Sequence, residues 1–155
     1  MKSLLLLAIA VGFSAAKDTP KDDAVKAEVK KLQGEWIVAH AEKEGKKLSE
    51  EERKKLSEYF LTKISIKDET MRFWISEKGK EDKAGEPTTF ELNLSKKPKR
   101  ILIKDVTLAI YSVDGDTLKA CVKGDFSTKP DDLPTSFDTN MNADWYLFVF
   151  KREKK

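Results

Sequence analysis

Residues 32–36 read Leu-Gln-Gly-Glu-Trp, with a glycine and a tryptophan two positions apart where the pattern of the chain changes. Before them, apolar residues recur at helical spacing, which predicts a short amphipathic helix over residues 24–32. After them, apolar residues follow one another in the manner of a β-strand. A bulky indole at the entry of a first strand predicts a small barrel whose end is plugged by Trp36.

The rest of the chain predicts an all-β, antiparallel up-and-down barrel of about eight strands, joined mainly by short turns. A capping box at residues 49–52 predicts one helix after the first strand, from Glu50 to about Tyr59. The dipeptide Asp114-Gly115 supplies the positive φ angles of a two-residue hairpin turn. The expected strands cover 36–41, 61–67, 71–76, 88–94, 100–104, 108–113, 116–122 and 145–151.

The N-terminus has the pattern of a secretory signal peptide. Lys2 provides a positive start, residues 4–13 are apolar, and residues 14–16 (Ser-Ala-Ala) form a small-residue cleavage site. The apolar run is shorter than the roughly 20 residues that span a membrane. We therefore expect cleavage after Ala16 and a secreted or periplasmic protein with no stable membrane anchor. The expected organisation is a signal peptide over 1–16, a charged tail and short helix over 17–31, and one barrel domain over 32–155.

Composition argues against several classes of partner. The chain has 30 basic and 27 acidic residues and a formal charge of +3, and the two signs are interspersed. Nucleic-acid binding needs a clustered basic stripe, so no nucleic-acid partner is expected. Cys121 is the only cysteine, which rules out an internal disulfide. Its place in an apolar alternation favours a small strand residue, with a reactive thiol or an intermolecular disulfide as the alternatives. We expect a monomer.

Few residues offer catalytic or metal chemistry. His40 is the only histidine, and it could form a dyad with Cys121 only if the fold brought the two together. Residues 138–144 place an oxygen-bearing side chain at every second position, as calcium loops do. That segment lacks the glycine and glutamate of an EF-hand loop, and a polar loop with Asx turns is the other interpretation. We predict no enzyme, no cofactor and no metal site.

Six motifs occur in a fixed order along the chain, at residues 32–36, 44–48, 95–99, 110–119, 133–137 and 151–153. Together they resemble the uncharacterised lipocalin-like domain of exported planctomycete proteins. The chain departs from that family at Ala109, where glycine is usual, and at Leu133, where arginine is frequent. The resemblance implies a lipocalin-like barrel and no established activity.

The lipocalin comparison also implies a structural pair. In lipocalins an arginine from the last strand packs over the tryptophan at the strand entry, which would place Arg152, or else Lys151, over Trp36. The other interpretation is that Arg152 belongs to a frayed basic tail. The residues expected to have structural roles are Gly34, Trp36, Asp114, Gly115 and Arg152.

The barrel interior is the remaining candidate site, because an eight-stranded barrel is either filled by side chains or holds one small ligand. Two functions stay open. One is a module that binds a small apolar molecule, and the other is a structural or interaction module with a filled barrel. The second would recognise another exported macromolecule through the long loop over 124–144. The predicted ligand-binding residues are Trp36, Val38, Met71, Phe73, Phe90, Leu92 and Ile110.

Overall fold

The computed structural model describes residues 20–56, 59–77 and 80–154, so the predicted signal peptide and the start of the charged tail lie outside the described residues. The described helices are α1 (Pro20–Leu32) and α2 (Glu50–Leu56), and two short 3-10 turns lie between the last two strands. Neither helix has the length and apolar character needed to cross a bilayer. The strands are β1 (Gly34–Lys43), β2 (Lys46–Leu48), β3 (Tyr59–Lys67), β4 (Thr70–Glu77), β5 (Lys83–Ala84), β6 (Thr88–Asn93), β7 (Lys99–Ile103), β8 (Thr107–Asp114), β9 (Thr117–Lys123) and β10 (Trp145–Arg152).

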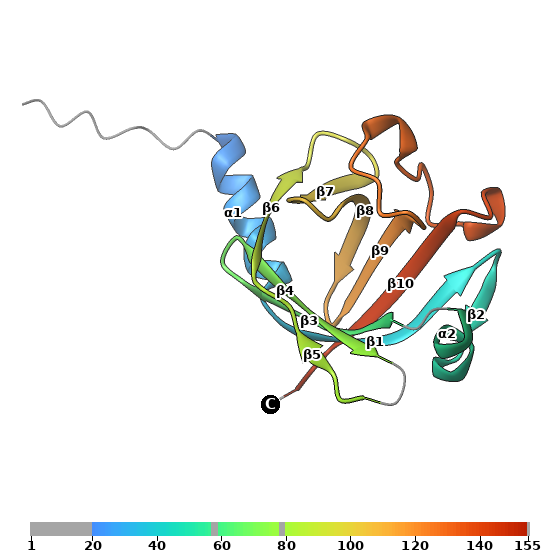
Figure 1. Cartoon of the computed structure of the whole chain (residues 1–155). Helices are drawn as coiled ribbons and strands as arrows, with labels where there is room; N and C mark the ends of the chain where they lie inside the picture. The colour runs from blue at the N-terminus through green and yellow to red at the C-terminus, as the bar shows by residue number, and fades with distance from the viewer. Residues whose placement is uncertain (1–19, 57–58, 78–79, 155) are drawn as a thin grey trace, which may run out of the picture.

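Eight of these ten strands close into an antiparallel barrel (Figure 1). The hydrogen-bonded order is β10-β9-β8-β7-β6-β4-β3-β1, and β1 pairs back onto β10 to complete the ring. The two remaining strands lie outside the ring, where β2 pairs with β1 and β5 pairs with β4. The predicted all-β barrel, with a helix before the first strand and another after it, is confirmed.

Several element boundaries differ from the prediction. Helix α1 begins at Pro20, because proline is tolerated in a first helical turn and the next residues place acids near the helix N-terminus. The predicted extension of α2 to Tyr59 is wrong, since Tyr59 begins β3 and pairs there with Glu77. Strands β2 and β5 were not predicted because they are short and polar, and only backbone pairing defines them.

Trp36 seals one end of the barrel. Its side chain is fully buried, and its Nε1 donates a hydrogen bond of 2.8 Å to the carbonyl of Leu32 in the last turn of α1. The Arg152 guanidinium carbon lies 4.0 Å from the centroid of the indole. The same guanidinium donates to the carbonyls of Gln33 and Lys31. The stack expected from the lipocalin comparison is therefore present, and it joins the last strand to the junction of α1 and β1.

Two glycines allow the chain to turn at this end. Gly34 has a φ of +114°, and a Cβ added to it would lie 3.1 Å from Nη1 of Arg152. Gly115 has a φ of +53° and forms the β8–β9 turn together with Asp116. The turn predicted at Asp114-Gly115 therefore lies one residue later, because Asp114 ends β8 and pairs with Thr117. Both positions take backbone conformations that a side chain disfavours.

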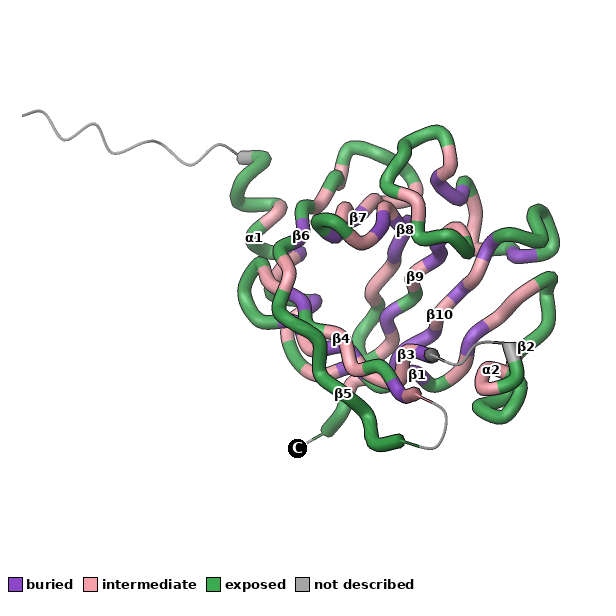
Figure 2. The backbone as a smooth tube through the Cα atoms, viewed as in Figure 1, coloured by how far each residue is buried: buried purple, intermediate pink, exposed green. Residues whose placement is uncertain are grey.

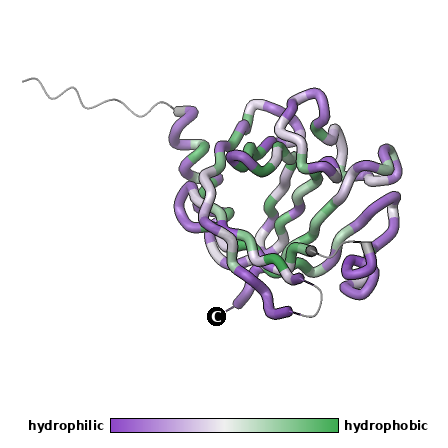
Figure 3. Tube along the Cα trace, in the orientation of Figure 1, coloured by the Kyte–Doolittle hydropathy of each residue, from purple (hydrophilic) through white to green (hydrophobic). Residues whose placement is uncertain are grey.

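The apolar residues form two clusters, and strands β8 to β10 contribute to both. One cluster lies in the barrel interior and includes Trp36 and Phe150. The other is covered by the loop over 124–144, which contributes Leu133 and Phe137. Buried and hydrophobic positions accordingly run along β8 to β10 (Figures 2 and 3). The members of the second cluster are Ile110, Cys121, Leu133, Trp145, Leu147 and Val149.

Candidate functional site: a cavity in the barrel

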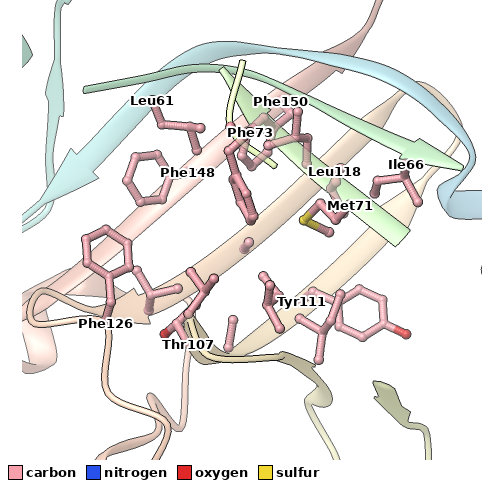
Figure 4. Close-up of a pocket in the computed structure, with 18 of the residues that line it drawn as sticks. Leu61, Ile66, Met71, Phe73, Thr107, Tyr111, Leu118, Phe126, Phe148 and Phe150 are labelled. Atoms are coloured by element: carbon pink, nitrogen blue, oxygen red, sulfur yellow. The ribbon is translucent and has the colours of Figure 1, made fainter. Parts of the chain in front are cut away.

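The barrel contains an apolar cavity of about 600 Å³. This volume lies within the range of about 300–1,000 Å³ that is typical of small-molecule sites. The strands that line it are β3, β4, β7, β8, β9 and β10, and the lining side chains are mostly aliphatic or aromatic (Figure 4). Phe73, Phe148 and Phe150 contribute aromatic rings to the lining.

Two features of the chain leave this space unfilled. Ala109 and Ala120 face the cavity from neighbouring strands, where larger side chains would occupy it. In addition, β4 and β6 pair only near Met71, and farther along β4 pairs instead with β5. The strands on the two sides of this seam therefore diverge, and the barrel opens toward the end of β4.

A buried carboxylate supports the closed end of the cavity. Glu28 projects from α1, and its side chain is only 4% exposed. Its oxygens accept hydrogen bonds from Lys99 (2.6 Å), Lys31 (3.1 Å) and the Tyr111 hydroxyl (3.4 Å). The Tyr111 ring lines the cavity while its hydroxyl points away from the space (Figure 4). Burial raises the pKa of Tyr111, and the Glu28 carboxylate raises it further, so the phenol stays a protonated donor.

This arrangement predicts an acid-dependent loss of stability. Burial alone would raise the pKa of Glu28, but hydrogen bonds from Lys99 and Lys31 outweigh it and hold the pKa below its ordinary value of 4.5. A carboxyl with a lower pKa in the folded state adds stability above its unfolded pKa and loses it as the pH falls through its folded pKa. We therefore expect the free energy of unfolding to fall below pH 4.5, and to fall less steeply in Glu28→Gln.

Urea unfolding between pH 7 and pH 3 measures this difference. Glu91→Gln is the matched control, because Glu91 is an exposed carboxyl on β6. Parallel pH profiles for the wild-type protein and Glu28→Gln would contradict the assignment.

The mouth of the cavity carries exposed apolar side chains. Ile75, near the end of β4, is 42% exposed, and Phe126, just after β9, is 50% exposed. Phe126 has a φ of +53°, a conformation that costs a non-glycine residue about 1–3 kcal/mol. That backbone places the aromatic ring at the rim, where it contributes to the lining (Figure 4).

The few polar groups among the described lining residues are already hydrogen-bonded within the protein or are exposed to solvent. The Thr107 hydroxyl donates to the carbonyl of Ser127 at 3.2 Å, and the Tyr111 hydroxyl donates to Glu28. Asp105 lies on the exposed turn between β7 and β8. The interior of the cavity is therefore suited to a hydrocarbon ligand, and polar groups that could bind a ligand lie only at its rim.

The structure separates the predicted ligand-binding residues. Met71 and Phe73 line the cavity. Trp36 and Val38 belong to the same core cluster as Met71 but do not line the cavity. Trp36 instead closes the end of the barrel beneath it. Phe90 and Leu92 line a separate recess beside α1.

Ile110 requires a correction. It was expected to point inward, but it belongs to the cluster beneath the loop over 124–144. Its neighbours Ala109 and Tyr111 line the cavity, so the alternation along β8 directs Ile110 to the opposite face. Because both faces of β8 are apolar, hydrophobicity alone did not show which of its residues point into the barrel.

Several residues that line the cavity were not predicted from the sequence. Phe126 and Thr107 follow no periodic apolar pattern, and Phe148 and Phe150 sit on a strand whose two faces are both apolar. For β10, the polar side chains of Lys151 and Tyr146 could have indicated which face of the strand points into the barrel.

The other residues considered for catalysis or metal binding make contacts that are typical of structural roles. Cys121 is fully buried in the second cluster, and burial raises the pKa of its thiol to about 12. His40 Nε2 lies 3.0 Å from a Glu42 carboxylate oxygen. In the segment 138–144, which has the spacing of a calcium loop, Asp138 accepts hydrogen bonds from the backbone and side-chain nitrogens of Asn140, which is an Asx turn. Among the described residues, no three His, Cys, Asp or Glu side chains group as metal ligands.

Comparison with known proteins finds no family model, no curated protein and no solved structure that matches this chain.

Proposed function

We propose that this protein is an exported, lipocalin-like carrier that holds one small apolar molecule inside its barrel. The observation that supports this function is the apolar cavity of about 600 Å³, which opens to solvent between Ile75 and Phe126. A purely structural barrel would gain stability by filling that space, at about 25 cal/mol for each Å² of apolar surface removed from water. This chain instead keeps alanines at 109 and 120, where larger apolar side chains would fill the barrel.

The competing function, recognition of a macromolecule through the loop over 124–144, has less support. Leu133 and Phe137 of that loop pack onto the outer faces of β8 to β10. Its Thr139 hydroxyl accepts a hydrogen bond from the Gly45 amide at 2.9 Å. These apolar residues are used within the chain as a cover for the second cluster.

Native mass spectrometry of protein purified from the cells that produce it tests the proposed function. The expected result is a species heavier than the polypeptide by the mass of one small molecule, which organic solvent extracts. A bare polypeptide mass, together with no displacement of an apolar fluorescent probe by any lipid extract of those cells, would contradict the carrier function. The mass of the polypeptide itself also tests the predicted cleavage after Ala16.

A further inference from the structure

We infer that the ligand is a long-chain carboxylate, with its hydrocarbon chain in the cavity and its carboxylate bound by Arg53 at the rim. This inference rests on the proposed function and adds the chemical class of the ligand. It starts from Arg53 on α2, whose Nε is buried and has no hydrogen-bond partner. A buried donor without a partner costs free energy, so its presence in a folded protein calls for an explanation.

Arg53 stands directly behind the rim of the cavity. Its guanidinium carbon lies 5.9 Å from the ring centroid of Phe60, and its Nη1 donates to the carbonyl of Leu61 at 3.3 Å. Both Phe60 and Leu61 line the cavity. Helix α2 thus places a cation one side chain away from the space that the hydrocarbon chain would fill.

The geometry of the guanidinium determines which head group fits. Nη1 donates to the Leu61 carbonyl, and the unpartnered Nε lies on the other edge of the guanidinium, which it shares with Nη2. The two N–H groups on such an edge are parallel and match the two oxygens of a planar carboxylate. A single carboxylate would therefore satisfy the buried Nε and the neighbouring nitrogen together. Burial also lowers the pKa of Arg53, as expected for a cation held away from water.

Among the described residues, the acids near Arg53 already have other partners. Lys54 lies over the same ring, 5.6 Å from its centroid, but Glu50 already pairs with it at 2.6 Å. Asp82 accepts a hydrogen bond from the Thr62 hydroxyl at 2.6 Å. Cations and acids nearly balance around α2, so selectivity for an anion would come from the unsatisfied hydrogen bonds of Arg53 and not from a net positive field.

The orientation of the ligand follows from the shape of the cavity. Its inner end is closed by Leu32, Ile66 and the Tyr111 ring, and the carboxylate of Glu28 lies behind that ring. An anionic head would be repelled there, and Lys99 and Lys31 are already bound to Glu28. The head group must therefore remain at the mouth, where Asp105 on one side would disfavour a carboxylate and Arg53 on the other would bind it.

The test compares tetradecanoic acid with tetradecan-1-ol, which has the same chain but a neutral head. Each competes at pH 8 with an apolar fluorescent probe bound to the purified, delipidated protein. We expect the acid to bind the wild-type protein about 10-fold or more tightly than the alcohol. In Arg53→Met the affinity for the acid should fall to that for the alcohol, because methionine keeps the contact with Phe60 and removes the donors.

Two further variants sharpen the test. Lys54→Met removes a cation over the same ring, one that is already paired, and should keep the preference for the acid. Arg53→Lys keeps the charge but lacks the parallel donors, and should lose most of the preference. Thermal unfolding of the ligand-free variants should show no loss of stability in Arg53→Met, since the replacement removes a buried unpaired donor.

Equal affinity of the wild-type protein for acid and alcohol would overturn the role of Arg53 and leave the carrier function standing. A loss of preference in Lys54→Met as large as in Arg53→Met would also overturn it, because the preference would then come from the general field of the helix. Failure of both compounds to bind would contradict the proposed function itself.

Discussion

Replacing Ala120 with tryptophan should abolish binding of apolar ligands while the barrel remains folded. Ala120 lies on β9 between two ring-bearing neighbours, since it pairs with Tyr111 on one side and Phe148 on the other. All three side chains line the cavity, so an indole at this position would occupy the space of a ligand. We expect the affinity for an apolar fluorescent probe to fall about 100-fold or more, which corresponds to about 2.7 kcal/mol.

The stability of Ala120→Trp should stay the same or rise, because the new side chain buries apolar surface in space that already exists. The matched control is Ala39→Trp, which introduces the same indole at an exposed position on β1. The control should bind the probe as the wild-type protein does. Unchanged probe affinity in Ala120→Trp, with a cooperative unfolding transition, would mean that the probe binds elsewhere.

Replacing Trp36 with alanine should produce the largest loss of stability among these substitutions. The indole is completely buried, carries the guanidinium of Arg152 on its face, and donates a hydrogen bond to the Leu32 carbonyl. Truncation of such an aromatic residue costs about 3–5 kcal/mol. Since a domain of this size has about 5–15 kcal/mol in total, urea unfolding should show a large shift of the midpoint.

Trp74→Ala is the control for this substitution. Trp74 is a half-buried indole on β4 that also carries a cation, with Lys63 Nζ 4.6 Å from its ring centroid. Its truncation should cost about 1 kcal/mol, as expected for a contact at the surface. Equal losses in the two variants would show that Trp36 does not seal the barrel in the way described.

The fold followed from local signals in the sequence because those signals are strong here. The capping box at Ser49 satisfies a local geometric requirement and occurs as expected. The hairpin turn after β8 also forms, but one residue later than predicted, at Gly115 and Asp116, because Asp114 pairs with Thr117 at the end of the strand. The hydrophobic alternation then placed the strands of the barrel, except for the two short polar strands. The start of β3 was assigned to α2 because helical spacing extends across residues that tertiary pairing draws into the sheet.

The site was much harder to predict than the fold. Whether a residue lines the cavity depends on the parity of its strand, and parity is ambiguous where a second cluster covers the outer face, as at Ile110. The cavity itself depends on the divergence of β4 from β6, which is a property of pairing and not of composition. Phe126 at the rim and Arg53 behind it come from a loop and a short helix with no periodic pattern.

A crystal structure with bromododecane would show where an apolar ligand binds, because the anomalous signal of bromine locates the ligand without any assumption about its pose. We expect a bromine position and a continuous chain inside the barrel, between the Tyr111 ring and Phe126 at the mouth. A bromine confined to the recess beside Phe90 and α1, or an interior closed by rotation of Phe73 and Phe148, would contradict this expectation.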